Sequence, residues 1–147
     1  MPNELHHRSH EKLNGYWKAI SNGRPFPPEN EINPDELADI WDSCFLVAVD
    51  VVAKRSGYRY SFLGERLIEA YGDDVRNPEV ATQLISTANP STAKKIDEVI
   101  QSQKPVVDEA EFVNSKGISI RYRSCLLPLG QAGKVTHVIG CMRWKLY

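Results

Sequence analysis

The chain has few cysteines and no long apolar run, and both shortages limit what it can be. Its three cysteines are widely spaced, with no Cys-x-x-Cys pair and no histidines at zinc spacing: Cys44, Cys125 and Cys141. We expect reduced, strand-borne thiols that fill small apolar spaces, with redox sensing as an alternative. No apolar stretch reaches the length of a membrane span or forms a signal peptide. We therefore expect a cytoplasmic protein without a membrane partner.

An excess of charge of one sign is also missing. The formal net charge is -1, so the composition gives no reason to expect nucleic acid as a partner. Five basic residues are candidates for a nucleic-acid-binding strip: Lys54, Arg55, Arg59, Arg121 and Arg123. We expect instead that they belong to a solvated face and that cross-strand glutamates neutralise part of their charge. With 41% hydrophobic and 25% charged residues in 147, the chain is predicted to fold as an ordinary globular protein with one core.

Histidine is absent from the middle of the chain, between Asp39 and Thr136. His6, His7 and His10 have helical metal-ligand spacing, but no acidic or thiol partner lies nearby, so we expect a solvated N-terminal tail and no metal site. His137 is predicted to be a hydrogen-bonded core residue. Tyr122, Ser124 and His137 lack a nucleophile elbow and an oriented carboxylate, so they are interpreted as polar anchors and no catalytic residue is assigned. The chain is not expected to be an enzyme.

The segment Tyr58–Gly72 changes its hydrophobic period in the middle. Tyr58, Tyr60 and Phe62 alternate as in a strand, whereas three residues after Gly64 recur at helical spacing: Leu67, Ile68 and Tyr71. Gly72 provides a helix stop. This pattern predicts a strand that passes into a short helix through one glycine.

The N-terminal third predicts a helix, an extended arm and a capped short helix. Apolar residues at helical spacing predict an amphipathic helix over 11–20: Leu13, Tyr16, Trp17 and Ile20. Three prolines favour an extended arm over 24–33, and Asn33-Pro34 is a capping sequence for the next helix. We therefore divide the chain into an N-terminal helix and proline-rich arm, 1–33, and a domain, 34–147.

The remaining elements follow from apolar runs and proline-led starts. Cys44–Val51 is apolar throughout, which predicts a strand in the interior of a sheet, followed by a turn at Lys54–Gly57. Asn77-Pro78 and Asn89-Pro90 are expected to begin two helices, the second reaching Gln103. Three further strands are predicted: Val106–Asn114, Ile118–Leu129 and Lys134–Trp144.

The register of the last three strands follows from their turns. A three-residue turn at Ser115–Gly117 places Glu111 opposite Arg121 and Glu109 opposite Arg123. A four-residue turn at Gly130–Gly133 then predicts the residues on each face. The inner face is expected to carry Ile120, Tyr122, Ser124, His137, Ile139 and Cys141, and the outer face Cys125, Leu127, Val138, Met142 and Trp144.

In this order of elements the chain resembles the PAS domain. The resemblance covers Leu13 to Trp144 and includes Leu13-x-x-x-Trp17, Gly23-Arg24-Pro25, Asn33-Pro34, Tyr58-Arg59-Tyr60-x-Phe62-x-Gly64, Tyr71-Gly72, Leu126-Leu127-Pro128-Leu129 and Val138-Ile139-Gly140. It implies an α+β fold in which crossover helices cover one face of a five-stranded antiparallel sheet and enclose a cavity. PAS domains bind haem, flavin, organic acids or nothing, so the resemblance leaves the cofactor unknown. Haem is disfavoured because the crossover lacks histidine, and a photoactive flavin because the helix expected over Gly64–Tyr71 lacks cysteine.

The resemblance implies a sensory domain that binds a small molecule and signals through protein association. The expected cavity is lined by Leu67, Tyr71, Leu84, Ile96, Ile100, Phe112, Ile120, Tyr122, Ser124, His137, Ile139 and Cys141. The expected interface is formed by Leu13, Tyr16, Trp17, Ile20, Val138, Met142 and Trp144, whose apolar surface needs cover. We expect a homodimer through this helix and a separate signalling protein as partner. The alternative is a ligand-free dimerisation or adaptor module.

Overall fold

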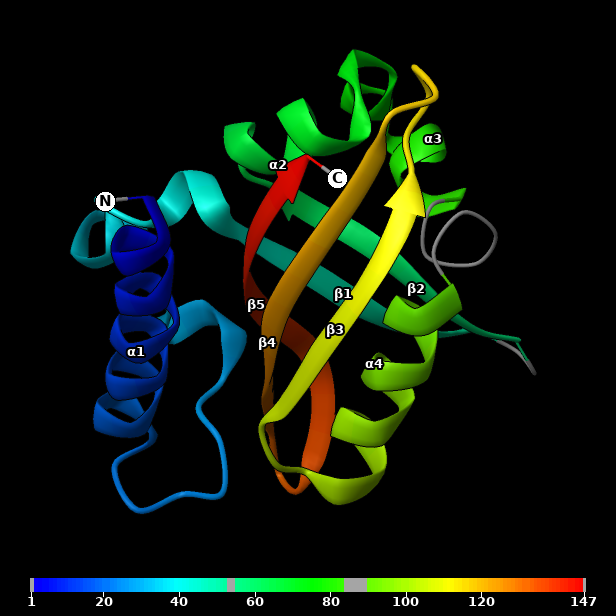
Figure 1. Cartoon of the computed structure of the whole chain (residues 1–147). Helices are drawn as coiled ribbons and strands as arrows, with labels where there is room; N and C mark the ends of the chain where they lie inside the picture. Colours follow the sequence, from blue (N-terminus) through cyan, green and yellow to red (C-terminus); the bar gives the residue numbers. More distant parts are fainter. Residues whose placement is uncertain (1, 53–54, 84–89, 147) are drawn as a thin grey trace.

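A five-stranded antiparallel sheet organises the chain, in the order β2-β1-β5-β4-β3 (Figure 1). The computed structural model describes residues 2–52, 55–83 and 90–146. Its strands are β1 Cys44–Val52, β2 Arg55–Leu63, β3 Val106–Val113, β4 Ser119–Gln131 and β5 Lys134–Leu146. The strand predicted from the apolar run after position 43 lies between two neighbours, which confirms that it is interior to the sheet.

Helices lie on both sides of this sheet, with α1 on the opposite side from α4 (Figure 1). The α-helices are α1 Pro2–Ser21, α2 Glu65–Tyr71, α3 Pro78–Gln83 and α4 Pro90–Ser102. Short 3-10 helices span Glu29–Glu31, Pro34–Leu37, Trp41–Ser43 and Asp73–Arg76. We call the face toward α2 and α4 the inner face and the face toward α1 the outer face. No helix in the described part of the chain has the length and apolar character needed to cross a membrane.

Local capping signals were predicted well. The Asn33 side chain accepts a hydrogen bond from the amide of Asp35 at 3.1 Å, and the first helical turn after it begins with Pro34. Gly64 lies between β2 and α2 because a Cβ there would meet the carbonyl oxygen of Asp42 at 2.2 Å. Gly72 ends α2 with φ of 120°, a conformation that favours glycine. The short element after Asn33 is a 3-10 helix.

Two predicted boundaries are wrong. The N-terminal helix begins at Pro2, so His6, His7 and His10 lie in a helix and not in a tail. The predicted turn at Lys54–Gly57 is too long, because the residues from Arg55 onward already belong to β2 and Arg55 pairs with Val52. Main-chain pairing with β1 outweighs the local turn preference of the glycine in that segment.

The predicted register of the β3–β4 hairpin is confirmed. Glu111 lies opposite Arg121, and Glu109 lies opposite Arg123. The Nη2 of Arg121 is 3.0 Å from the Oε1 of Glu111, and the Nη1 of Arg123 is 3.3 Å from the Oε1 of Glu109. The agreement of charge pairing with apolar pairing on the other face was therefore a reliable register signal.

The predicted register of the β4–β5 hairpin is wrong. The strands continue to Gln131 and Lys134, which leaves a two-residue turn, and a register shift follows between Leu129 and Gly130. His137 consequently lies opposite Leu129, not opposite Leu126. Because side chains alternate along a strand, this bulge moves the β5 residues from His137 onward to the face opposite the predicted one.

The amphipathic stripe of α1 docks on the outer face of its own chain. Leu13 is fully buried, and the indole nitrogen of buried Trp17 donates a hydrogen bond to the carbonyl oxygen of Pro128 at 2.8 Å. Phe26, in the proline-rich arm, joins the same hydrophobic core as the sheet. Tyr16 and Ile20 are half-buried at the edge of this contact. The division into 1–33 and 34–147 stays a prediction.

The hairpin register gives a first testable prediction. Glu111→Arg should lower the free energy of unfolding by about 0.5–1 kcal/mol, because three cations would then lie side by side in the row that continues through Arg121 to Lys145. Adding Arg121→Glu in the same chain should restore most of the loss, as measured by chemical denaturation. Additive losses would show that the two side chains do not interact.

A second prediction concerns the close approach at Gly140 on β5. A Cβ at this position would lie 2.1 Å from the ring of Phe45 and 2.7 Å from the carbonyl oxygen of Cys125. Gly140→Ala should therefore destabilise the fold by about 1–3 kcal/mol through overpacking. Gly15→Ala is the matched control, because Gly15 lies within α1 with open space around its Cβ position. That change should raise stability by about 0.5–1 kcal/mol in the same denaturation experiment. Equal effects of the two changes would contradict the packing described for β5.

Candidate functional site

A buried carboxylate lies on the inner face of the sheet. Asp108, on β3, has only 1% of its surface exposed to solvent. Its Oδ2 accepts a hydrogen bond from the hydroxyl of Tyr122 at 2.7 Å, and its Oδ1 accepts one from the hydroxyl of Ser91 at 2.8 Å. Two neutral donors from β4 and α4 therefore hold one acidic group away from water.

Two more phenols complete what we call the Asp108 cluster, which consists of Asp108, Ser91, Tyr60, Tyr71 and Tyr122. Burial raises the pKa of the Tyr60 phenol, a hydrogen bond with Tyr71 lowers it, and electrostatic interactions with Tyr122 and Asp108 raise it again. The net effect is a raised pKa, so Tyr60 stays a neutral hydroxyl. The hydroxyl of Tyr71 also contacts the sulfur of Met142 at 4.0 Å.

Aromatic rings surround the cluster and pack closely on one another. The rings of Tyr71 and Phe112 are stacked, with their centroids 4.8 Å apart. The ring centroids of Phe112 and Tyr122 are 5.9 Å apart. Phe45 meets Tyr60 edge to face at 6.0 Å. The polar atoms therefore lie within an apolar, largely aromatic shell, as in sites that orient a small ligand by a few polar groups.

The strand pattern explains how Asp108 reaches this position. Val106, Asp108, Ala110 and Phe112 alternate along β3, and the register places Asp108 directly opposite buried Ser124. Our sequence analysis did not assign Asp108 a role. The available signal was a single acidic residue in the otherwise apolar set of alternating positions on β3.

The structure brings together most residues of the predicted cavity lining. Tyr71, Phe112, Tyr122 and Ser124 are buried at the inner face, and the core there also includes Leu67, Ile96 and Ile120, with Ile100 partly buried against it. The side chain of Leu84 lies outside the described residues.

Three predicted lining residues are not at the inner face. His137, Ile139 and Cys141 belong to the outer face, because Cys141 lies opposite Cys125 and Ile139 opposite Leu127. The Nδ1 of half-buried His137 is 2.9 Å from the Oγ1 of Thr136, its own neighbour in sequence.

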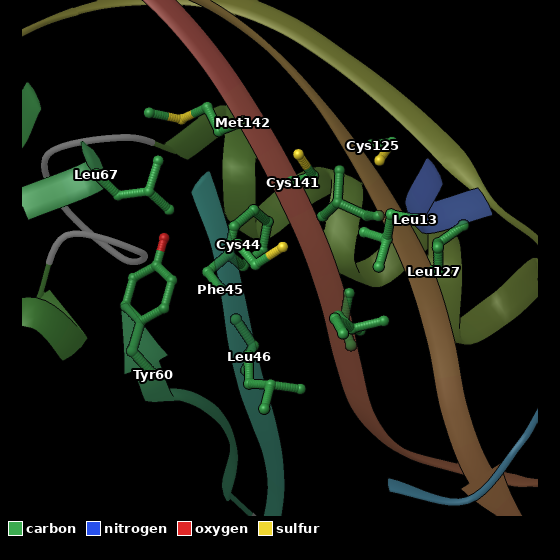
Figure 2. Packing of buried hydrophobic residues seen from close by; sticks show 14 of the residues in the cluster. Leu13, Cys44, Phe45, Leu46, Tyr60, Leu67, Cys125, Leu127, Cys141 and Met142 are labelled. Carbon is green, nitrogen blue, oxygen red and sulfur yellow. The ribbon is translucent and has the colours of Figure 1, made fainter. Parts of the chain in front are cut away.

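The prediction assigned the interface residues of β5 to the wrong face for the same reason. Val138, Met142 and Trp144 lie on the inner face, where the indole nitrogen of Trp144 donates to the carbonyl oxygen of Arg66 at 2.8 Å. In Figure 2, Met142 and Leu67 lie on one side of β5, whereas Leu13, Leu127 and Cys125 lie on the other. The bulge in the β4–β5 hairpin accounts for all of these exchanges.

The cysteines form a row of adjacent thiols at the outer face, under α1. Cys44, Cys141 and Cys125 are cross-strand neighbours on β1, β5 and β4. Burial raises the pKa of the Cys125 thiol to about 12. The hydrogen bond with Cys44 and burial raise the pKa of Cys141 as well. Cys125 and Cys141 are therefore neutral packing groups, and the described residues include no group of three His, Cys, Asp or Glu side chains placed to hold a metal ion.

Two concavities are described, and both are at the surface. The first, of about 520 Å³, lies over charged residues of β3, β4 and β5. The second, of about 530 Å³, lies at the C-terminal end of α4, near Lys104. Neither lining includes Asp108, although the first includes Tyr122.

Two solved structures with a similar fold are a PAS domain and a variant of a fungal photoreceptor. The PAS domain of a protein from Colwellia psychrerythraea is 14% identical, with a TM-score of 0.50, over 74% of this chain and 93% of that one. A variant of the fungal photoreceptor Vivid is 16% identical, also with a TM-score of 0.50, over 90% of this chain and 93% of that one. At these identities the likeness shows the fold alone. The comparison with curated proteins gives no match.

A family model supplies the stronger assignment. The model described as the PAS domain matches residues 5–143, which include most of α1 and β5, the other four strands and the crossover helices. The five-stranded antiparallel sheet with flanking helices agrees with this match. The chain belongs to the PAS domain family.

Proposed function

We propose that this PAS sensory domain binds a small molecule at the Asp108 cluster and passes the signal to a separate protein. The observation that carries the proposal is a carboxylate only 1% exposed among aromatic rings. Burying a carboxylate is costly unless hydrogen bonds compensate for the lost water. An apolar residue would fill this position on β3 without that cost, so the acidic group has a use beyond packing.

The chemistry of the cluster favours a ligand with hydrogen-bond donors. An ionised carboxylate has about four acceptor positions, and Tyr122 and Ser91 each donate one hydrogen bond to it. An ammonium or amide nitrogen of a small organic ligand would use the remaining positions. The rings of Tyr71 and Phe112 would contact its apolar or cationic part.

Haem does not suit this cluster. The side chains of the cluster offer only oxygen atoms to its iron, and His137 lies on the outer face of the sheet. The helix α2 carries no cysteine, so a cysteine-dependent flavin photoreaction remains disfavoured there.

One observation favours a second function, that of a ligand-free adaptor. The inner face is well packed without a ligand, because Tyr71 stacks on Phe112 and Asp108 accepts hydrogen bonds from neighbouring side chains. In that case the domain would act through its surfaces alone. A homodimer remains part of the proposal, but Leu13 and Trp17 are buried within one chain, so a dimer through α1 requires exchange of this helix between copies.

The hydrogen bond from Tyr122 gives a stability prediction. Tyr122→Phe should lower the free energy of unfolding by about 1–3 kcal/mol, because a buried carboxylate loses one of its donors. Tyr58→Phe is the matched control, since the Tyr58 hydroxyl donates to the exposed side chain of Asp97 on α4. We expect a smaller loss there by chemical denaturation. A loss at Tyr58 equal to that at Tyr122 would contradict the importance given to the buried carboxylate.

Native mass spectrometry of the protein purified from its own host tests the ligand directly. We expect a retained small molecule in the unaltered chain and its loss in Asp108→Asn, because the neutral amide offers one acceptor oxygen in place of two. Glu109→Gln is the control, since Glu109 is an exposed neighbour on the other face of β3. A ligand retained by all three proteins would exclude Asp108 as its anchor. A ligand-free mass in the unaltered chain would favour the adaptor function.

A further inference from the structure

A basic concavity lies over charged side chains of the outer face of the sheet, and its lining also includes Tyr122 of the Asp108 cluster. Its volume is about 520 Å³, and its charged lining is formed by Arg121, Arg123, Arg143, Lys145, Glu109 and Glu111. On β4 the two arginines alternate with Tyr122, so they share the face of Cys125. Both arginine side chains are nearly half exposed, at 46% and 44%. The concavity is therefore open to a partner from solution.

Like charges face each other across two strands of this concavity. Arg123 lies directly opposite Arg143, and Arg121 directly opposite Lys145. Like charges in directly opposite positions destabilise a sheet. Glutamates on β3 pair with Arg121 and Arg123, but the described residues provide no ion pair for Arg143 or Lys145. Two cations of this surface, Arg143 and Lys145, therefore do not stabilise the folded state.

The spacing of these cations matches an extended acidic peptide. The two rows, Arg123 with Arg143 and Arg121 with Lys145, are two residues apart along β4 and β5, which is about 6.6 Å at 3.3 Å per residue. Carboxylates at alternate positions of an extended chain have the same separation. Each carboxylate would bridge one facing cation pair, and guanidinium groups bind carboxylates by charge-assisted hydrogen bonds.

The surroundings of the concavity select among possible anionic partners. Glu109 and Glu111 border the cations along β3 and repel any anion there, so an anionic partner is confined to the cation rows of β4 and β5. A second copy placed face to face would bring the excess cations of both copies together. Val107 and Val113, 50% and 61% exposed on the same face of β3, offer apolar contacts to the side chains of a peptide.

We propose that the basic concavity binds an extended acidic segment of a partner protein, with carboxylates at alternate positions. The inference rests on the proposed function in one respect, that the domain acts on a separate protein. It does not depend on a ligand at the Asp108 cluster. The segment lies along β4 and β5, and its carboxylates contact Arg143 and Lys145 as well as the two arginines of β4.

Fluorescence anisotropy with a labelled synthetic peptide tests this surface. The probe alternates glutamate with threonine, and a second probe has the same composition with its glutamates in one block. We expect the alternating peptide to bind more tightly, and its affinity to fall with rising salt. Arg143→Glu should weaken binding roughly tenfold or more, and Lys145→Glu similarly. Lys94→Glu, an equal charge change at an exposed position of α4, should leave binding unchanged.

The melting temperature serves as the control for these variants, because it shows whether each variant still folds. Arg143→Glu replaces a like-charge pair with an opposite-charge pair, so its melting temperature should be equal to or above that of the unaltered chain. An alternating lysine and threonine peptide should bind Arg143→Glu better than it binds the unaltered chain. Equal binding of the alternating and block peptides, equal weakening by Lys94→Glu, or tighter binding of a single-stranded oligonucleotide would overturn the proposal. Peptide binding that survives Asp108→Asn, while the retained ligand is lost, would separate this surface from the ligand site.

Discussion

The single bulge in the β4–β5 hairpin determines which chemistry each face of the sheet carries. It lies between Leu129 and Gly130, where a Cβ on Gly130 would meet the carbonyl oxygen of Lys134 at 2.0 Å. The amide of Gly130 donates to the carbonyl oxygen of Pro27 at 2.9 Å, so the proline-rich arm is attached at the same point. Because one extra residue changes the face of every later side chain, this local feature assigns Met142 and Trp144 to the inner face.

That assignment gives the sheet two faces with different properties. The inner face combines Asp108 and three phenols with aromatic packing, whereas the outer face combines the docked helix α1 with an exposed, charged end. Tyr122 lies between Arg121 and Arg123 on β4, so the proposed ligand site and the proposed peptide site share one segment of strand. A ligand bound to the remaining acceptor positions of Asp108 would lie beside the Tyr122 hydroxyl, on the strand that presents both arginines. This shared segment is the physical connection through which we propose that the two sites influence each other.

The docking of α1 within its own chain changes how association can occur. Leu13 is fully buried, and Trp17 forms a hydrogen bond to the backbone of β4, so the apolar stripe already has its cover. The three cysteines beneath it are free and buried, which suits a packed layer between helix and sheet. A partner that leaves this helix in place meets the charged end of the outer face instead. There, charge complementarity rather than apolar area would determine the choice of partner.

The sequence alone determined the element types and the first register, because their signals are local. Periodicity, capping residues and the glycines at 64 and 72 act within a few residues, and the pairing of Glu111 with Arg121 follows from one short turn. Most of the inner-face lining followed from the same patterns. The tertiary structure decided the faces of β5, the hydrogen bonds that Ser91 and Tyr122 donate to Asp108, and the docking of α1 in its own chain. These depend on a bulge and on contacts between segments distant in sequence, for which no short-range pattern exists.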